Sequence, residues 1–187
     1  MLSTGEIKKG VAVEVDGNLY QVIEVQHVKT KKSAVYKVKL RDLRAGHIIE
    51  RSFNAGEKLV AARVERRDMQ YLYGDQDGLT FMNTQTFEQF MVPRNIAANA
   101  IDFIKEGDTL QVLTYGEEAL GVEVPASVVL KITRSDPGAK GDTATGATKP
   151  ATMETGLVVD VPLFINEGDT IKVSTSTRGY IERVATA

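Results

Sequence analysis

The chain of 187 residues contains no cysteine and no tryptophan. The lack of cysteine excludes disulfides and thiolate metal ligands, and nothing indicates secretion. Aromatic residues make up only 6% of the chain, and the two histidines are His27 and His47. Neither histidine has a nucleophile or a second metal ligand near it in the sequence, so we expect structural roles for both. We therefore predict no catalytic residue, no metal site, no cofactor and no enzyme activity.

Long apolar runs are also missing. No stretch approaches the roughly 18 residues that a membrane helix needs. The first 25 residues lack an apolar segment followed by a cleavage site of small residues. With 42% hydrophobic and 26% charged residues, the composition is typical of a soluble globular protein. These features predict a cytoplasmic protein with no membrane partner.

The net charge of −2 conceals an uneven distribution along the chain. Residues 1–64 carry 12 basic and 7 acidic groups, whereas residues 65–129 carry 4 basic and 11 acidic groups. Residues 130–187 are balanced, with 7 of each. A basic end joined to an acidic middle favours separate modules, of which the basic one faces an acidic partner.

The basic charge is concentrated in one predicted β-hairpin. Residues 20–28 and the alternating residues 34–40 read as strands, so residues 29–33 form its exposed tip. Seven basic side chains lie between residues 28 and 44, against the single acid Asp42. They are Lys29, Lys31, Lys32, Lys37, Lys39, Arg41 and Arg44. This charge suits a polyanion, but a solvated lysine fringe that discourages edge pairing would look the same.

Most of the remaining chain reads as short strands separated by turns, which predicts an all-β fold. The only helical region is expected between Thr86 and Lys105, where Pro93 interrupts the pattern. A short turn near residues 86–90 and a short helix from about Arg94 to Phe103 are predicted there.

A repeat divides the chain into modules. The pattern Ile-x-x-Gly-x-x-aliphatic-x-Val begins at Ile7, at Ile104 and at Ile165. The last two copies share Glu-Gly-Asp-Thr, and each copy precedes a turn with glycine and a second strand. Three small β-barrels, over residues 1–64, 65–128 and 129–187, account for this pattern most simply. Modules of about 60 residues are marginal alone, so packed interfaces between neighbours are expected.

Residues 149–168 contain Met-Glu-Thr-Gly, Val-Asp-Val-Pro and Ile-Asn-Glu-Gly in order. This run resembles the signature of bacterial elongation factor P. Further agreement covers essentially the whole chain: Gly-Glu-Lys at 56–58, Tyr-Leu-Tyr at 71–73, Phe-Met-Asn at 81–83, Thr-Phe-Glu-Gln at 86–89, Asp-Pro-Gly at 136–138 and Lys-Gly-Asp-Thr at 140–143. The resemblance implies an SH3-like barrel followed by two OB-folds, arranged in a row with a tRNA-like outline.

The resemblance also implies a function. Members of this family bind the ribosome between the P and E tRNA sites, where the first domain's tip steadies peptidyl-tRNA. They thereby stimulate peptide-bond formation at consecutive prolines. Two rival interpretations remain open. One is an elongation factor P-like paralogue with a divergent tip, and the other is a general nucleic-acid-binding protein built on OB-folds.

The family's tip reads Val-Lys-Pro-Gly-Lys-Gly, and its central lysine is often modified by an enzyme. Counting forward from Lys29 places that lysine at Lys32, which we prefer, whereas counting backward from Lys39 places it at Lys31. With Lys32 as the central lysine, Thr30, Lys31 and Ser33 replace the family's proline and both glycines. The implied partners are the ribosome, peptidyl-tRNA and a lysine-modifying enzyme.

The resemblance implies further RNA contacts. The tRNA- and rRNA-binding residues would be Lys29, Lys31, Lys32, Lys37, Lys39, Tyr180 and Arg183. Tyr180 could stack and Arg183 could bind phosphate, although a simple edge-strand pair is the alternative. A loop facing the E-site mRNA codon would contain Asp142, Thr145 and Gly146, unless it is only a surface loop.

Overall fold

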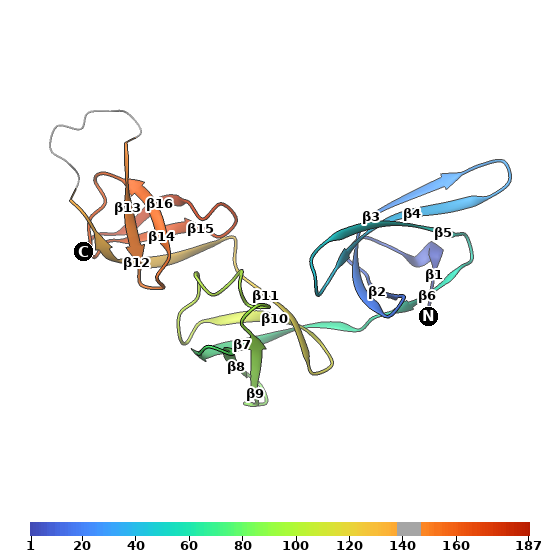
Figure 1. Ribbon diagram of the computed structural model, residues 1–187, viewed down its shortest axis with the longest axis horizontal. Coiled ribbons are helices and arrows are strands. Elements are labelled where there is room, and N and C mark those ends of the chain that lie inside the picture. Colours follow the sequence, from blue (N-terminus) through green and yellow to red (C-terminus); the bar gives the residue numbers. More distant parts are fainter. Residues whose placement is uncertain (138–146) are drawn as a thin grey trace. The chain divides into compact units, whose positions relative to one another are not determined.

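The structure, a computed structural model, describes residues 1–137 and 147–187, and its regular secondary structure is almost entirely β-strand (Figure 1). Within those ranges the only helix is the 3₁₀ helix η1, Thr4–Glu6. The chain divides into two compact units. One comprises Met1–Arg67 with Val112–Gly121, and the other Asp68–Gln111 with Val122–Ala187. The all-β prediction is confirmed.

The first sheet has six strands and belongs to the first unit. In spatial order they are β1 (Leu2–Ser3), β6 (Lys58–Ala61), β2 (Ala12–Val15), β3 (Asn18–Lys29), β4 (Ala34–Asp42) and β5 (Ile48–Asn54). On β4, Val38 and Leu40 are fully buried while Lys37, Lys39 and Arg41 are exposed. This confirms the alternation predicted for the basic hairpin.

The second sheet has five strands. In spatial order they are β11 (Glu118–Glu123), β10 (Thr109–Tyr115), β7 (Val64–Gly74), β8 (Gly78–Asn83) and β9 (Gln89–Pro93). Met69, Leu79 and Phe81 are almost completely buried on β7 and β8. Between β7 and β8, Asp75 Oδ1 accepts hydrogen bonds from the backbone N–H groups of Asp77 and Gly78, an arrangement typical of a turn that begins with aspartate.

The third sheet also has five strands and belongs to the second unit. In spatial order they are β14 (Val158–Pro162), β13 (Thr148–Met153), β12 (Ser127–Ser135), β15 (Thr170–Ser174) and β16 (Tyr180–Ala185). Its core contains Leu130, Ile132, Val161 and Ile171, all at most 1% exposed. Phe103, from the segment before β10, is buried in the same core.

The helix predicted from Arg94 to Phe103 is wrong. The segment instead forms separate turns, in which Ala97 N–H donates to the Pro93 carbonyl and Ile101 N–H to the Ala97 carbonyl. It is short for a helix and contains three Asn or Asp residues, whose side chains compete for backbone groups. The Asn99 side-chain amide donates to the Val122 carbonyl, so a contact with a distant strand helps to hold these turns.

The sequence repeat is a structural repeat. Gly10, Gly107 and Gly168 all have φ between +90° and +94°, a conformation that favours glycine. Each glycine N–H donates to a carbonyl of another strand, at 2.7, 2.7 and 3.0 Å respectively. In the last two copies the shared aspartates, Asp108 and Asp169, also accept a backbone N–H three residues upstream at 2.8 and 2.9 Å. The same turn therefore starts one strand in each of the three sheets.

Candidate nucleic-acid interface

The basic hairpin is formed by β3 and β4 and ends in an exposed loop (Figure 1). β2 pairs with β3 only from Asn18 to Gln21, whereas β4 pairs with β3 as far as Lys29. β5 lies on the other side of β4 and pairs with it as far as Val35. The outer part of β3 is therefore a free strand edge among the residues that the structure describes.

Four residues close the tip. Thr30 N–H donates to the Ser33 carbonyl at 2.8 Å, and the Thr30 hydroxyl donates to the same oxygen at 2.8 Å. The Ser33 N–H in turn donates to Thr30 Oγ1 at 3.2 Å. Polar side chains therefore form the turn for which the resemblance implied proline and glycine. Lys31 and Lys32 are its two exposed central residues, so the choice of Lys32 over Lys31 stays a prediction.

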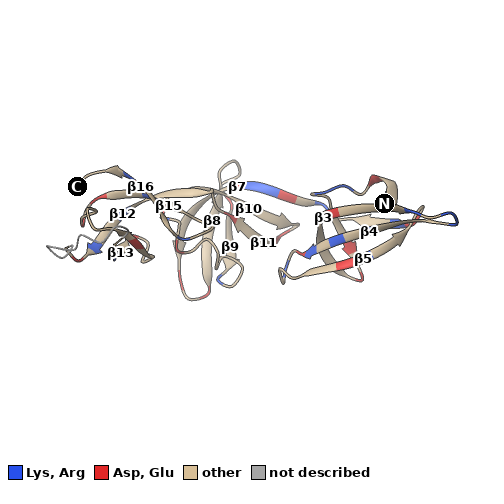
Figure 2. Ribbon diagram, turned by 90° about the horizontal axis from the view of Figure 1, so that it is seen from above, with Lys and Arg blue, Asp and Glu red and all other residues tan. Residues whose placement is uncertain are grey.

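The lysines of the hairpin differ in their surroundings, and Figure 2 shows basic residues at its tip. Lys29, Lys31, Lys32 and Lys37 form no ion pair with any residue that the structure describes. Lys39 differs, because its Nζ lies 2.9 Å from Glu24. The hydrogen bond to Glu24 raises the pKa of Lys39, so part of its charge is already balanced.

The outer hairpin carries a pair of stacked rings that sequence analysis missed. His27 and Tyr36 are direct cross-strand partners, and their rings lie 4.3 Å apart with planes 5° from parallel. His27 is exposed, whereas Tyr36 packs partly against the core of the first sheet. The sequence could have predicted this pair, because His27 and Tyr36 lie equally far from the centre of the turn, between Lys31 and Lys32. Residues at equal distances from the centre of a hairpin turn are cross-strand partners.

The second histidine lies at the opposite end of β4. His47 Nε2 is 3.9 Å from Asp42 Oδ2. Asp42 is buried and accepts the backbone N–H groups of Arg44 and Ala45 at 2.8 Å each. The bond from Ala45 is the main cause that lowers the pKa of Asp42. Asp42 therefore stabilises the turn after β4, and the position of His47 beside it fits the structural role expected for this histidine.

The predicted C-terminal contacts lie on β16. Tyr180 packs against the core of the third sheet, and Arg183 approaches a buried carboxylate. Arg183 Nη1 is 3.8 Å from Asp169 Oδ2, and its guanidinium carbon is 5.3 Å from the centre of the Phe164 ring. Both side chains therefore have intramolecular partners, as the edge-strand alternative expects, while both remain partly accessible. Contact of Tyr180 and Arg183 with tRNA stays a prediction.

The predicted mRNA-facing residues Asp142, Thr145 and Gly146 lie outside the described residues. Within the described ranges, no group of three or more acidic or histidine side chains could hold a metal ion. No helix in those ranges is long and apolar enough to cross a membrane.

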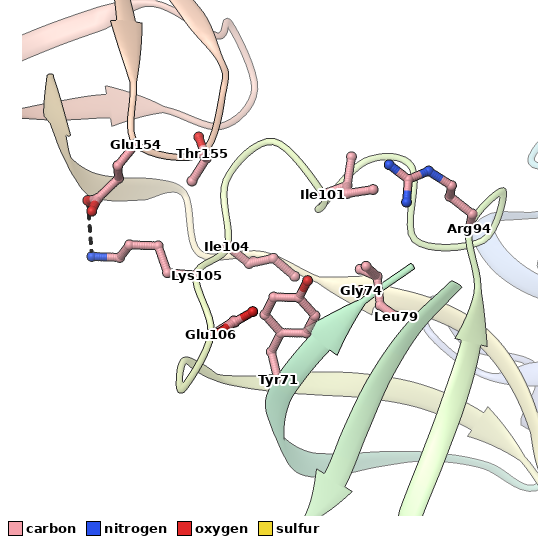
Figure 3. Close-up of a pocket in the computed structure, with 10 residues that line it drawn as sticks. All are labelled: Tyr71, Gly74, Leu79, Arg94, Ile101, Ile104, Lys105, Glu106, Glu154 and Thr155. Atoms are coloured by element: carbon pink, nitrogen blue, oxygen red, sulfur yellow. Dashed lines mark ion pairs between the residues drawn. The ribbon is translucent and has the colours of Figure 1, made fainter. Parts of the chain in front are cut away.

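A cavity of about 620 Å³ lies in the second unit (Figure 3). Arg94, Lys105, Glu106 and Tyr71 contribute polar groups to its lining. Lys105 already pairs with Glu154 at 3.4 Å. Burial raises the pKa of Tyr71, so its hydroxyl stays protonated and can only donate or accept hydrogen bonds at neutral pH. Charges of both signs line the cavity, which does not resemble a phosphate site.

Comparison with known protein families gives three consecutive matches. Residues 3–59 match the family described as the elongation factor P KOW-like domain. Residues 64–122 match the elongation factor P OB domain, and residues 128–183 match the elongation factor P C-terminal family. The chain belongs to the elongation factor P family.

Curated relatives agree with elongation factor P along almost the whole chain. The elongation factor P of Moorella thermoacetica is 50% identical over 184 residues, covering 98% of this chain and all of that protein. Those of Acetivibrio thermocellus and Ruminiclostridium cellulolyticum are 48% and 46% identical over 185 residues, with the same coverage. These relatives support a translation elongation factor rather than a general OB-fold binder.

Solved structures with a similar fold include the eukaryotic translation initiation factor 5A from Methanococcus jannaschii. It aligns with a TM-score of 0.54 at 20% identity, over 65% of this chain and 92% of that one. A translation initiation factor 5A family protein from Naegleria fowleri aligns with a TM-score of 0.52 at 17% identity, over 66% and 94%. With the elongation factor P family matches, these alignments support the SH3-like and OB-type fold.

Proposed function

We propose that this chain binds the ribosome between the P and E tRNA sites, with its β3–β4 hairpin directed at peptidyl-tRNA. Bound there, it steadies the tRNA end and stimulates peptide-bond formation at consecutive prolines. The observation that supports this proposal is the concentration of positive charge without ion-pair partners at the tip of the hairpin and on the adjoining part of β4. Lys29, Lys31, Lys32 and Lys37 have no ion-pair partner among the described residues, in a chain whose net charge is −2.

The chemistry requires no catalytic side chain. Proline is a conformationally restricted nucleophile, and holding the peptidyl-tRNA end lowers the entropic cost of reaching the geometry of attack. Lysine contacts to backbone phosphates hold an RNA in place without reading its sequence. We therefore propose a cytoplasmic factor that has no enzyme activity and uses no cofactor.

The tip lysine proposed for enzymatic modification is Lys32, with Lys31 as the alternative. Both side chains are exposed at the centre of the loop, so an enzyme could reach either. Intact-mass measurement of natively expressed protein, with peptide mapping over residues 29–37, distinguishes the two and detects an unmodified lysine. An unshifted mass would contradict modification.

Further contacts belong to the same proposal. Lys39 adds a weaker contact to RNA because Glu24 balances part of its charge. Tyr180 and Arg183 contact tRNA, and the loop with Asp142, Thr145 and Gly146 faces the E-site codon.

The proposal also includes the division of the chain into three domains, which comprise residues 1–64, 65–128 and 129–187.

A polyproline reporter tests the function. In a strain that lacks its own elongation factor P, expression of this chain should restore synthesis of a protein with consecutive prolines. A reporter without the prolines controls for general effects on translation. The double variant Lys31→Ala/Lys32→Ala should fail to restore synthesis while being expressed and folded. No rescue by the unchanged chain would contradict the proposal.

A further inference from the structure

A row of three aromatic side chains crosses the outer end of the first sheet. Phe53 on β5 pairs with Tyr36 on β4, which pairs with His27 on β3. Exposure increases along this row, from 7% at Phe53 to a half-buried Tyr36 and an exposed His27. The row therefore begins in the core and ends at the surface.

His27 is exposed and lies on the free edge of β3. The His27 and Tyr36 rings are stacked in parallel, so the stack runs across the strands from β4 to β3. Beyond β3, no strand among the described residues pairs with residues 23–29. A flat aromatic ligand could therefore continue the stack on the exposed side of His27.

The charges beside this ring favour an anionic ligand. Successive residues of a strand alternate between its faces, which places Lys29 on the same face as His27 and about 7 Å further along β3. On this face the outer hairpin carries Val25, His27, Lys29, Ala34, Tyr36 and Val38, none of them acidic. Glu24 lies among the lysines of the opposite face. A flat ring that carries negative charge describes a nucleotide better than an aromatic side chain of a protein.

We propose that His27 is a stacking platform for an unpaired RNA base and that Lys29 binds a phosphate next to that base. This inference rests on the proposed function, because it assigns a base contact to the hairpin that approaches peptidyl-tRNA. Stacking tolerates any base, so the platform strengthens binding without selecting a sequence. The base belongs either to the unpaired 3′ end of the tRNA or to ribosomal RNA.

The test measures the protein concentration that gives half-maximal acceleration of Pro-Pro peptide formation on purified ribosomes. His27→Ala should raise the half-maximal concentration about 5- to 150-fold, the range for loss of one stacked base. His27→Phe keeps a ring and should remain within about 2-fold of the unchanged chain. His47→Ala, at the other end of β4, is the matched control and should have no effect.

Salt dependence separates the two residues. Lys29→Gln should lower the slope of log affinity against log salt by about 1, because one phosphate contact is lost. His27→Ala should weaken binding and leave that slope unchanged. A changed slope for His27→Ala would overturn the stacking role.

The source of the base is tested with 2-aminopurine at the 3′ end of the P-site tRNA. Quenching by the unchanged chain and by His27→Phe, but not by His27→Ala, would assign the base to tRNA. The same kinetic pattern without quenching would assign it to ribosomal RNA. Equal half-maximal concentrations for His27→Ala and the unchanged chain would overturn the inference, as would equal impairment by His27→Ala and His27→Phe. Failure of the unchanged chain to stimulate would instead contradict the proposed function.

Discussion

Arg178 donates to Asp102 at 2.6 Å across 76 positions of the sequence. The Arg178 guanidinium carbon also lies 5.2 Å from the centre of the Phe103 ring, which is buried in the core of the third sheet. The Asp102 carbonyl accepts a hydrogen bond from the Thr155 hydroxyl at 2.6 Å. A residue in the turn between β15 and β16 therefore helps to hold the segment before β10 in place.

Removal of this arginine should destabilise the second unit. Arg178→Ala loses an ion pair and a cation–π contact, for which we expect about 1–2 kcal/mol in the free energy of unfolding. Backbone strain does not offset this loss, because alanine at φ +59° is strained as well. Urea denaturation measures the change. The control, Lys172→Ala, breaks an exposed pair with Glu182 and should cost less than about 0.5 kcal/mol; equal losses would contradict the prediction.

The repeated glycines should differ in their tolerance of alanine. Both Gly107 and Gly168 have positive φ, which costs a residue with a Cβ about 1–2 kcal/mol. A Cβ at Gly107 would meet nothing within 4 Å, whereas one at Gly168 would lie 2.8 Å from Ala187 Cβ. Gly168→Ala should therefore lower the thermal midpoint more than Gly107→Ala. Deletion of Ala187 from both variants should reduce this difference, and an unchanged difference would exclude the clash as its cause.

Asp169 should make the free energy of unfolding fall at low pH. Its carboxylate is buried and accepts the backbone N–H groups of Asn166 and Ala187, of which the Asn166 bond contributes most to lowering its pKa. A lowered folded-state pKa contributes stability above the unfolded value of about 3.9, and this contribution is lost as pH falls through the folded pKa. Urea denaturation from about pH 6 to about pH 2.5, a range that spans the ordinary carboxyl pKa of about 4, should show this loss.

The variant Asp169→Asn should flatten that acid dependence. At pH 7 it should lower the free energy of unfolding by about 1–3 kcal/mol, because a buried amide replaces the carboxylate that accepted two N–H groups. Asp160→Asn removes one charge at an exposed position of β14 and should cost less than about 0.5 kcal/mol at pH 7. An acid profile unchanged in Asp169→Asn would show that other carboxylates cause the loss.

The effect of replacing a hairpin lysine should depend on its position in the hairpin and on whether it has an ion-pair partner. In the polyproline reporter, Lys32→Ala should impair rescue more than Lys37→Ala, since Lys32 lies at the centre of the tip. Lys39→Ala should impair it least, because Glu24 already balances part of the Lys39 charge. Equal losses for all three variants would favour a diffuse electrostatic contribution. Circular dichroism melting checks that each variant folds.

Features that depend on neighbouring residues could be predicted from the sequence. Alternation placed Val38 and Leu40 in the core and the lysines of β4 at the surface. The sequence repeat around Gly107 and Gly168 predicted that two sheets contain the same turn, because turn conformation depends on a few adjacent residues. Strand patterns and turns together predicted an all-β chain with a basic hairpin.

Features that depend on distant residues required the tertiary structure. The segment from Arg94 to Phe103 looked helical, but the burial of Phe103 and the hydrogen bonds that Asn99 and Asp102 form with distant residues favour turns. The stack of His27 on Tyr36 follows from strand register, which one misplaced turn residue would change. By itself, the sequence determined the strands, the repeated turns and the charge of the hairpin. The fold alone decided which of these charges and rings are free, because their partners come from remote parts of the chain.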